Sequence, residues 1–197
     1  MPSGLADLLA DLGSALQAAG RDWYLFGAQA AVLYGSARLT ADVDATVDAP
    51  LEVVEALLVP LALWHFEARV ENPTDFARTT RVLPLLHTPS GMPCDLVLGG
   101  PGLEELFLER AEIFDVEGVR VPVARADDIV VMKILAGRPK DLEDAAAILR
   151  AAPETLNLAS AHSLLAELEN ALDRGDLLPV LEQLLSEIEN PPARRKT

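Results

Sequence analysis

The stretch Trp23-Tyr24-Leu25-Phe26-Gly27-Ala28, followed by Asp42-Val43-Asp44, decides the fold of this chain. Its first four residues form an apolar run that predicts a short buried strand, and Gly27 marks a turn. A helix of small residues over 28–34 then leads to a second strand over 42–47. Because residues two apart on a strand point to the same side, Asp42 and Asp44 are expected to lie side by side.

These carboxylates suggest a metal–nucleotide site. Hard oxygen ligands are those that Mg²⁺ prefers, and a glycine turn at a helix start exposes N–H groups that suit a phosphate. A third carboxylate, Asp95, interrupts the apolar run 93–98, where its burial is costly without a positive partner. If the strand of Asp95 lies beside that of Asp42 and Asp44, the three carboxylates converge and can hold two divalent ions. The alternatives are a solvated strand start for the pair, and for Asp95 an ion pair with an arginine such as Arg81.

Composition narrows the class of protein. The chain has 197 residues, half of them hydrophobic, which suits one main domain with a helical appendage. A formal net charge of −15 disfavours general nucleic-acid binding and fits a metal, a small substrate or a basic protein partner. A single cysteine, Cys94, excludes an internal disulfide and fits the cytoplasm. Residues 1–12 do not read as a secretory signal, and no apolar run approaches the ~20 residues that span a bilayer.

Hydrophobic periodicity predicts an α/β (α+β) fold, with a sheet flanked by helices and a helical region after it. We expect a core over 1–125, a C-terminal helical region over 126–190 and a flexible basic tail over 191–197. Residues 71–80 are expected to be irregular. The expected strands are 23–26, 42–47, 64–70, 81–87 and 92–98, with a small hairpin over 116–123.

Two sequence blocks carry a family resemblance. The run Phe26-Gly27-Ala28, then Gly35-Ser36-Ala37-Arg38-Leu39-Thr40-Ala41-Asp42-Val43-Asp44, resembles the polymerase-β-like nucleotidyltransferase superfamily. The Arg-x-Thr before the Asp pair looks most like the AbiEii-type nucleotidyltransferases of bacterial toxin–antitoxin and abortive-infection systems. Lys133 and the later Arg138-Pro139-Lys140-Asp141-Leu142-Glu143-Asp144 are similar to the helix lysine and Arg-x-Lys-Asp-x-x-Asp block of that group. The resemblance covers roughly residues 12–149 and implies a nucleotidyltransferase-like mixed sheet.

The resemblance implies Mg²⁺-dependent transfer of a nucleoside monophosphate from a nucleoside triphosphate to an acceptor hydroxyl. The acceptor would be a tRNA, a protein or a small molecule, and a partner protein of a toxin–antitoxin pair is expected. Asp42, Asp44 and Asp95 would be the catalytic carboxylates and the ligands of two ions, with Asp95 helping to deprotonate the acceptor. Nucleotide contacts are expected from Gly27, Ala28, Ser36, Arg38, Lys133 and Lys140, with Asp141 and Asp144 in support.

Ala28 departs from the family pattern, which usually has Gly or Ser there. The loss of one hydrogen bond to a charged group costs about 1.5–3 kcal/mol, unless Ser36 supplies the hydroxyl instead. Two rival functions therefore stay open: a catalytically weak or inactive interaction module with the same fold, and an aminoglycoside nucleotidyltransferase. Plainer roles also stay open for Lys133, as a lysine at the edge of an amphipathic helix, and for Lys140, Asp141 and Asp144, as helix N-terminal residues.

Overall fold

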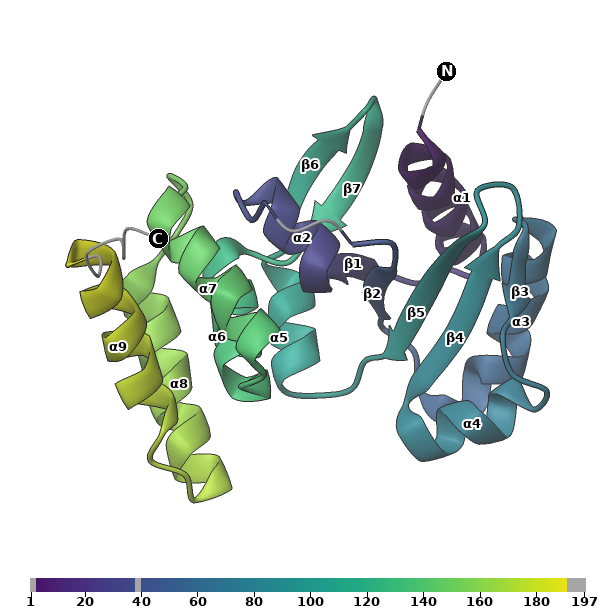
Figure 1. Ribbon diagram of the computed structural model, residues 1–197. Helices are drawn as coiled ribbons and strands as arrows, with labels where there is room; N and C mark the ends of the chain where they lie inside the picture. Colours follow the sequence, from purple (N-terminus) through teal and green to yellow (C-terminus); the bar gives the residue numbers. More distant parts are fainter. Residues whose placement is uncertain (1–2, 38–39, 191–197) are drawn as a thin grey trace. The chain divides into compact units, whose positions relative to one another are not determined.

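The chain folds into two compact units. The computed structural model describes residues 3–37 and 40–190 (Figure 1). The first unit combines Met1–Ala30 with Leu39–Ala124, and the second combines Ala31–Arg38 with Arg125–Thr197. Within the described ranges, no helix has both the length and the apolar character needed to cross a membrane.

The first unit holds the sheet and the second is helical. The strands are β1 (Trp23–Phe26), β2 (Val43–Val47), β3 (Phe66–Ala68), β4 (Val82–His87), β5 (Met92–Leu98), β6 (Glu112–Val116) and β7 (Val119–Val123). The helices of the first unit are α1 (Gly4–Ala18), the 3₁₀ turn η1 (Leu51–Val53), α3 (Val54–Leu63), α4 (Pro73–Thr80) and α5 (Leu103–Glu109). Helix α2 (Gly27–Leu33) begins in the first unit and ends in the second. The second unit contains α6 (Ala126–Ala136), α7 (Pro139–Ala151), α8 (Leu158–Leu172) and α9 (Leu177–Glu189).

The sheet has seven strands in the order β3-β4-β5-β2-β1-β7-β6. The pairs β2–β5 and β1–β7 are parallel, and the other neighbours are antiparallel. The expected mixed α/β sheet with flanking helices is therefore confirmed. It places β5, with Asp95, directly beside β2, with Asp44.

One face of the central strands forms the core, and the other carries the acidic residues. Alternate residues of β2 and β5 are fully buried; these are Val43, Ala45, Val47, Cys94, Leu96 and Leu98. Helix α1 packs against β5, β7 and α3 with a side made of Leu8, Leu9, Leu12 and Leu16. Asp44 and Asp95 are only partly buried, which leaves their face accessible.

Three elements differ from the sequence expectation. Residues Pro73–Thr80, expected to be irregular because they are polar, form α4, which begins with Pro73 in the first turn and buries Ala77. Residues 51–59, whose sequence predicts a helix that starts after Pro50, form η1 and the first part of α3, and α3 continues to Leu63 with Pro60 inside it. Strand β6 begins at Glu112 and alternates exposed and half-buried residues, because it is an edge strand.

Candidate functional site

A row of side chains crosses the accessible face of the sheet in the first unit. The parallel register pairs Asp44 with Asp95, and the antiparallel registers on either side pair Phe26 with Asp44 and Pro84 with Asp95. Neighbouring strands lie about 4.8 Å apart, and register partners point to the same side. The two carboxylates are therefore immediate neighbours, as the sequence predicted for adjacent strands.

Gly27 is forced against the first of these carboxylates. Its φ of +70° lies in the left-handed region, at the turn between β1 and α2. A Cβ atom at this position would lie 2.7 Å from the Cγ of Asp44 and 2.8 Å from its Cβ, closer than real Cβ contacts. Glycine is thus required both by the backbone conformation and by the approach to Asp44. The predicted neighbourhood of glycine turn and carboxylate is present in the structure.

Asp42 lies just before β2 and is exposed. Its Oδ1 accepts a hydrogen bond from the hydroxyl of Thr40. Among the described residues, no group of three His, Cys, Asp or Glu side chains is placed to hold a metal ion. The structure brings Asp44 and Asp95 together and leaves Asp42 outside such a group.

Asp95 pairs with Arg69, which directly follows β3. The backbone N–H of Arg69 donates to the carbonyl of Pro84, and Pro84 lies in register with Asp95. Arg69 therefore continues the same row, and its guanidinium donates to Asp95 Oδ1. The alternative that Asp95 pairs with an arginine is therefore confirmed, but the partner is Arg69. Arg81, named as an example, donates to the carbonyls of Leu98 and Gly99 instead.

The Arg69–Asp95 pair is easily replaced by another ligand. Both side chains are 38% exposed, and exposed ion pairs contribute only about 0–1 kcal/mol. The donor set of this face consists of hard carboxylate oxygens, which suits Mg²⁺ at metal–oxygen distances of about 2.0–2.1 Å. The residues therefore fit a divalent cation in chemistry.

Cys94 lies between the two carboxylates in the chain but on the opposite, buried face. Burial raises the pKa of its thiol well above the ordinary range, and the charges of Asp95 and Asp44 raise it further, against a lowering by Arg69. The thiol is therefore protonated and unreactive at neutral pH. Cys94 is a small core residue.

A separate cluster of charges is buried inside the helical unit. Lys133 on α6 donates to Asp141 Oδ1 at 3.1 Å and to Asp144 Oδ2 at 2.8 Å, both on α7. The hydroxyl of Ser36 donates to Asp144 Oδ1 at 3.0 Å, and Arg138 donates to both oxygens of Asp141. Lys133, Asp141, Asp144 and Ser36 are all at most 6% exposed. This cluster binds α6, α7 and the 31–38 segment together.

The electrostatics of the cluster keep Asp141 ionised. Burial by itself raises the pKa of this carboxyl, but the hydrogen bonds from Arg138 and Lys133 outweigh it and hold the pKa below 3.8. A buried carboxylate with two cationic donors is a well-compensated charge. Asp141 therefore carries its negative charge throughout the neutral range.

This arrangement corrects several expected nucleotide contacts. Ser36 and Lys133 were expected to touch the nucleotide, but both are buried and held by Asp144. Ser36 therefore does not supply the hydroxyl that Ala28 lacks, and Ala28 itself is 4% exposed. Asp141 and Asp144 do orient a lysine, as predicted, and that lysine is Lys133. Lys140 is exposed, and Arg38 lies outside the described residues.

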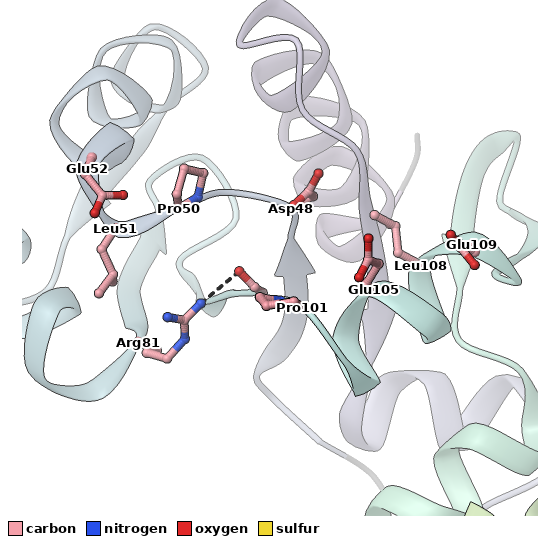
Figure 2. Close-up of a pocket in the computed structure, with 11 residues that line it drawn as sticks. Asp48, Pro50, Leu51, Glu52, Arg81, Pro101, Glu105, Leu108 and Glu109 are labelled. Carbon is pink, nitrogen blue, oxygen red and sulfur yellow. Dashed lines mark hydrogen bonds between the residues drawn. The ribbon is translucent and has the colours of Figure 1, made fainter.

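A pocket of about 550 Å³ lies elsewhere in the first unit, after the carboxyl ends of β2 and β5 (Figure 2). Asp48, Glu52, Glu105 and Glu109 line it, and Figure 2 shows Arg81 bonded to a backbone oxygen at its edge. Asp48 follows Asp44 by four residues of an extended strand, about 13 Å along β2. The acidic pocket and the Asp44–Asp95 pair are thus at opposite ends of one strand.

Sequence reasoning missed Arg69 and the lining of this pocket. Arg69 precedes Asp95 by 26 residues and reaches it only through the β3–β4–β5 register, which no local pattern reveals. His87 shows no metal-ligand spacing with the other histidines and is expected to be a packing or surface residue. It is indeed buried, and both of its ring nitrogens are also hydrogen-bonded. The spacing of His87 and Ser90 within one tight turn was the available signal.

No protein-family model and no curated protein matches the chain. Several solved structures match it. An antigenic nucleotidyltransferase-like protein from Paracoccidioides brasiliensis is 19% identical with a TM-score of 0.56, covering 92% of each chain. The antibiotic-resistance factor ANT(2'')-Ia is 14% identical with a TM-score of 0.59, covering 93% of this chain and 97% of the other. The chain therefore has the fold of nucleotidyltransferase-like proteins.

Proposed function

We propose that this chain is a nucleotidyltransferase that moves a nucleoside monophosphate from a nucleoside triphosphate to an acceptor hydroxyl. One observation carries the proposal: Asp44 and Asp95 lie in register on adjacent parallel strands, with Gly27 pressed against Asp44. The sequence motif, the register and the fold agree at this one place.

The catalytic roles follow from this row of residues. Asp44 and Asp95 would hold Mg²⁺, which would neutralise the charge of the triphosphate when bound. Asp42, which lies just before β2 and outside the row, is proposed as a third ligand that turns toward the cation when it binds. Asp95 is proposed to accept the proton of the acceptor hydroxyl, and the backbone of Gly27 and Ala28 to face the phosphates. Arg69, once displaced from Asp95, has a planar group of donors suited to phosphate oxygens. The number of bound Mg²⁺ ions, proposed to be two, can be measured by calorimetric titration.

The residues of the helical cluster are proposed as supports rather than as ligands. Lys133, Asp141, Asp144 and Ser36 fix α6 and α7 to the segment that follows α2. Lys140 and Arg38 remain proposed contacts of the nucleotide or the acceptor. The acceptor itself, the AbiEii-type assignment and a toxin–antitoxin partner are proposals that rest on the sequence resemblance, as is a cytoplasmic location.

A transfer assay with Asp44→Asn tests the proposal. The purified chain is incubated with Mg²⁺, each of the four α-labelled nucleoside triphosphates and cell extract. We expect label on an acceptor with the wild type and at least a hundredfold less with Asp44→Asn. Asp48→Asn, which changes an exposed carboxylate just after the other end of β2, serves as the comparison variant. Absence of transfer together with absence of any nucleotide-induced rise in melting temperature would falsify the proposal.

A non-catalytic interaction module is the second candidate. It is favoured by the pairing of Asp95 with Arg69, by Ala28, and by the lack of a three-ligand group within the described residues. A net charge of −15 suits a basic protein partner. Binding of a partner without any nucleotide-dependent transfer would support this candidate. Transfer to an aminoglycoside is tested separately, by drug resistance on expression.

A further inference from the structure

A hydrogen-bonded serine, histidine and aspartate lie in the first unit, outside the Asp44–Asp95 row. Ser90 is in the turn between β4 and β5, His87 ends β4, and Asp11 is on α1. The Oγ of Ser90 lies 2.7 Å from Nδ1 of His87, and the Nε2 of His87 lies 3.0 Å from Oδ2 of Asp11. This is the order in which a nucleophilic hydroxyl, a base and an orienting carboxylate are joined in activated serines.

The tautomer of His87 follows from its two partners. An ionised carboxylate can only accept, so in the neutral ring Nε2 carries the hydrogen that is donated to Asp11. Nδ1 is then an acceptor, and the hydroxyl of Ser90 donates to it. Oγ also accepts the backbone N–H of Met92 at 3.2 Å, which favours negative charge on the oxygen. The proton of Ser90 is therefore already directed at a base.

Exposure separates the nucleophile from its base. The side chain of His87 is fully buried, Ser90 is half-buried, and the side chain of Asp11 is 23% exposed. The flanking turn residues Thr88, Pro89 and Gly91 are exposed. A substrate can thus approach Ser90 from the turn while the imidazole stays away from water.

The N-terminus of α1 lies against Ser90 and favours an anionic product there. A Cβ placed on Gly4 would be 3.1 Å from the Cβ of Ser90. The N–H groups of Ala6 and Asp7 are already donated to Ser3, whereas those of Gly4 and Leu5 have no acceptor in the described part of the chain. The first turn of this 15-residue helix stabilises a phosphate group through its N–H groups and the helix dipole.

We propose that Ser90 is a modification site that accepts the nucleotidyl group, which makes the acceptor a protein serine hydroxyl. The inference rests on the proposed function and names its acceptor class. Ser90 Oγ attacks the α-phosphorus of the triphosphate, an Oγ–P bond forms, and the bond to the bridging oxygen breaks. Pyrophosphate leaves with the electron pair. The proton of Ser90 passes to Nδ1 of His87, which for this acceptor takes the place of Asp95 as the base. The negative charge of Asp11 stabilises the positive charge of the imidazolium.

The geometry points to transfer between two copies of the chain. His87 is in register with Met92 and shares the buried face with Cys94, whereas Asp95 points to the other face of β5. A nucleotide beside Asp95 is therefore on the opposite side of the sheet from the Ser90–His87–Asp11 set. A second copy of the chain can bring its exposed turn with Ser90 to the Asp44–Asp95 row, because its Ser90 is not fixed on the opposite side of the same sheet.

Mass spectrometry of mixed variants tests this inference. The wild type is incubated with Mg²⁺ and each of the four nucleoside triphosphates, digested, and searched for a nucleotidylated Ser90 peptide. We expect the modification in the wild type and its loss in Ser90→Ala. Thr88→Ala is the control, because it removes another hydroxyl of the same turn that is not bonded to His87, and it should still be modified. The Asp44→Asn variant alone should stay unmodified. When it is mixed with the Ser90→Ala variant, which keeps Asp44 and Asp95, the Asp44→Asn protein should become modified at its Ser90.

Two variants test the role of the base. His87→Gln and the milder Asp11→Asn are expected to slow the modification at least tenfold, with folding checked by tryptophan fluorescence. An unchanged rate in folded Asp11→Asn and His87→Gln contradicts the inference. Modification of another residue, or transfer to an added acceptor with Ser90 unmodified, overturns the inference and leaves the proposed function standing. If no nucleotide is bound and none is transferred by any variant, the proposed function fails as well.

Discussion

Substitution of Gly27 by alanine tests whether this glycine is needed for the approach of the backbone to Asp44. Two effects add at this position. A non-glycine residue with φ near +70° costs about 1–2 kcal/mol. The new methyl group would also meet Asp44 at 2.7–2.8 Å, and overpacking of this kind costs about 1–3 kcal/mol. We therefore expect Gly27→Ala to lower the free energy of unfolding by about 2–5 kcal/mol.

Gly20 provides a matched control. Its φ is +66°, and a Cβ there would meet nothing within 4 Å, so Gly20→Ala carries the backbone cost alone. The smaller conformational freedom of alanine in the unfolded chain affects both variants and cancels in the comparison. The difference between Gly27→Ala and Gly20→Ala, about 1–3 kcal/mol, measures the contact with Asp44.

The assay is urea-induced unfolding followed by tryptophan fluorescence. Both tryptophans of the chain, Trp23 and Trp64, lie in the first unit, so the signal reports on the unit that contains the site. In an Asp44→Gly background, which removes the Cβ and the carboxylate, Gly27→Ala should cost no more than Gly20→Ala. Equal costs of Gly27→Ala and Gly20→Ala in the wild-type background would refute the reasoning.

Three further predictions concern the charged residues. Arg69→Ala should bind Mg²⁺ more tightly than the wild type, as measured by calorimetry, because the substitution releases Asp95; weaker binding would contradict this. The same variant should change the free energy of unfolding by no more than about 1 kcal/mol. Lys133→Met should destabilise the helical unit by about 3–5 kcal/mol, measured by circular dichroism, because two buried carboxylates, Asp141 and Asp144, lose the cationic donor that they share. Exposed Lys140→Met should stay within about 0.5 kcal/mol. The pKa of Asp141 is lower in the folded chain than its ordinary 3.8, so its contribution is complete above pH 3.8 and is lost as pH falls below it. Asp141→Asn should abolish that part of the acid sensitivity, and an unchanged acid transition would show that Asp141 does not contribute.

The local parts of the fold could be read from the sequence because their signals are short-range. Four consecutive apolar residues before Gly27 gave β1 at its observed bounds, and alternating apolar runs around 88–91 gave the β4–β5 hairpin. Helix α4 escaped prediction because it is short and mostly polar, so that its composition resembles that of a loop.

The site could be predicted only in part. Asp44 and Asp95 were recognised as a pair from their residue type and from the resemblance, and the register bears out their adjacency. Burial of Lys133 could not be foreseen, because it depends on Ser36 and Asp144, which are 108 residues apart. The three-residue spacing of Asp141 and Asp144 places them on one side of α7 and could have indicated a common cation.

The division of the chain has a consequence for how it is made and cut. Because Ala31–Arg38 belongs with Arg125–Thr197, the helical unit is assembled from two separate stretches, with most of the sheet encoded between them. During synthesis the first stretch leaves the ribosome long before its partners exist. A truncation after Ala124 strands it, and a fragment that starts at Arg125 lacks the hydroxyl that Ser36 gives to Asp144. A single cut in the chain therefore cannot separate the two units intact. Fragments for biophysical work require circular permutation or co-expression of the two stretches.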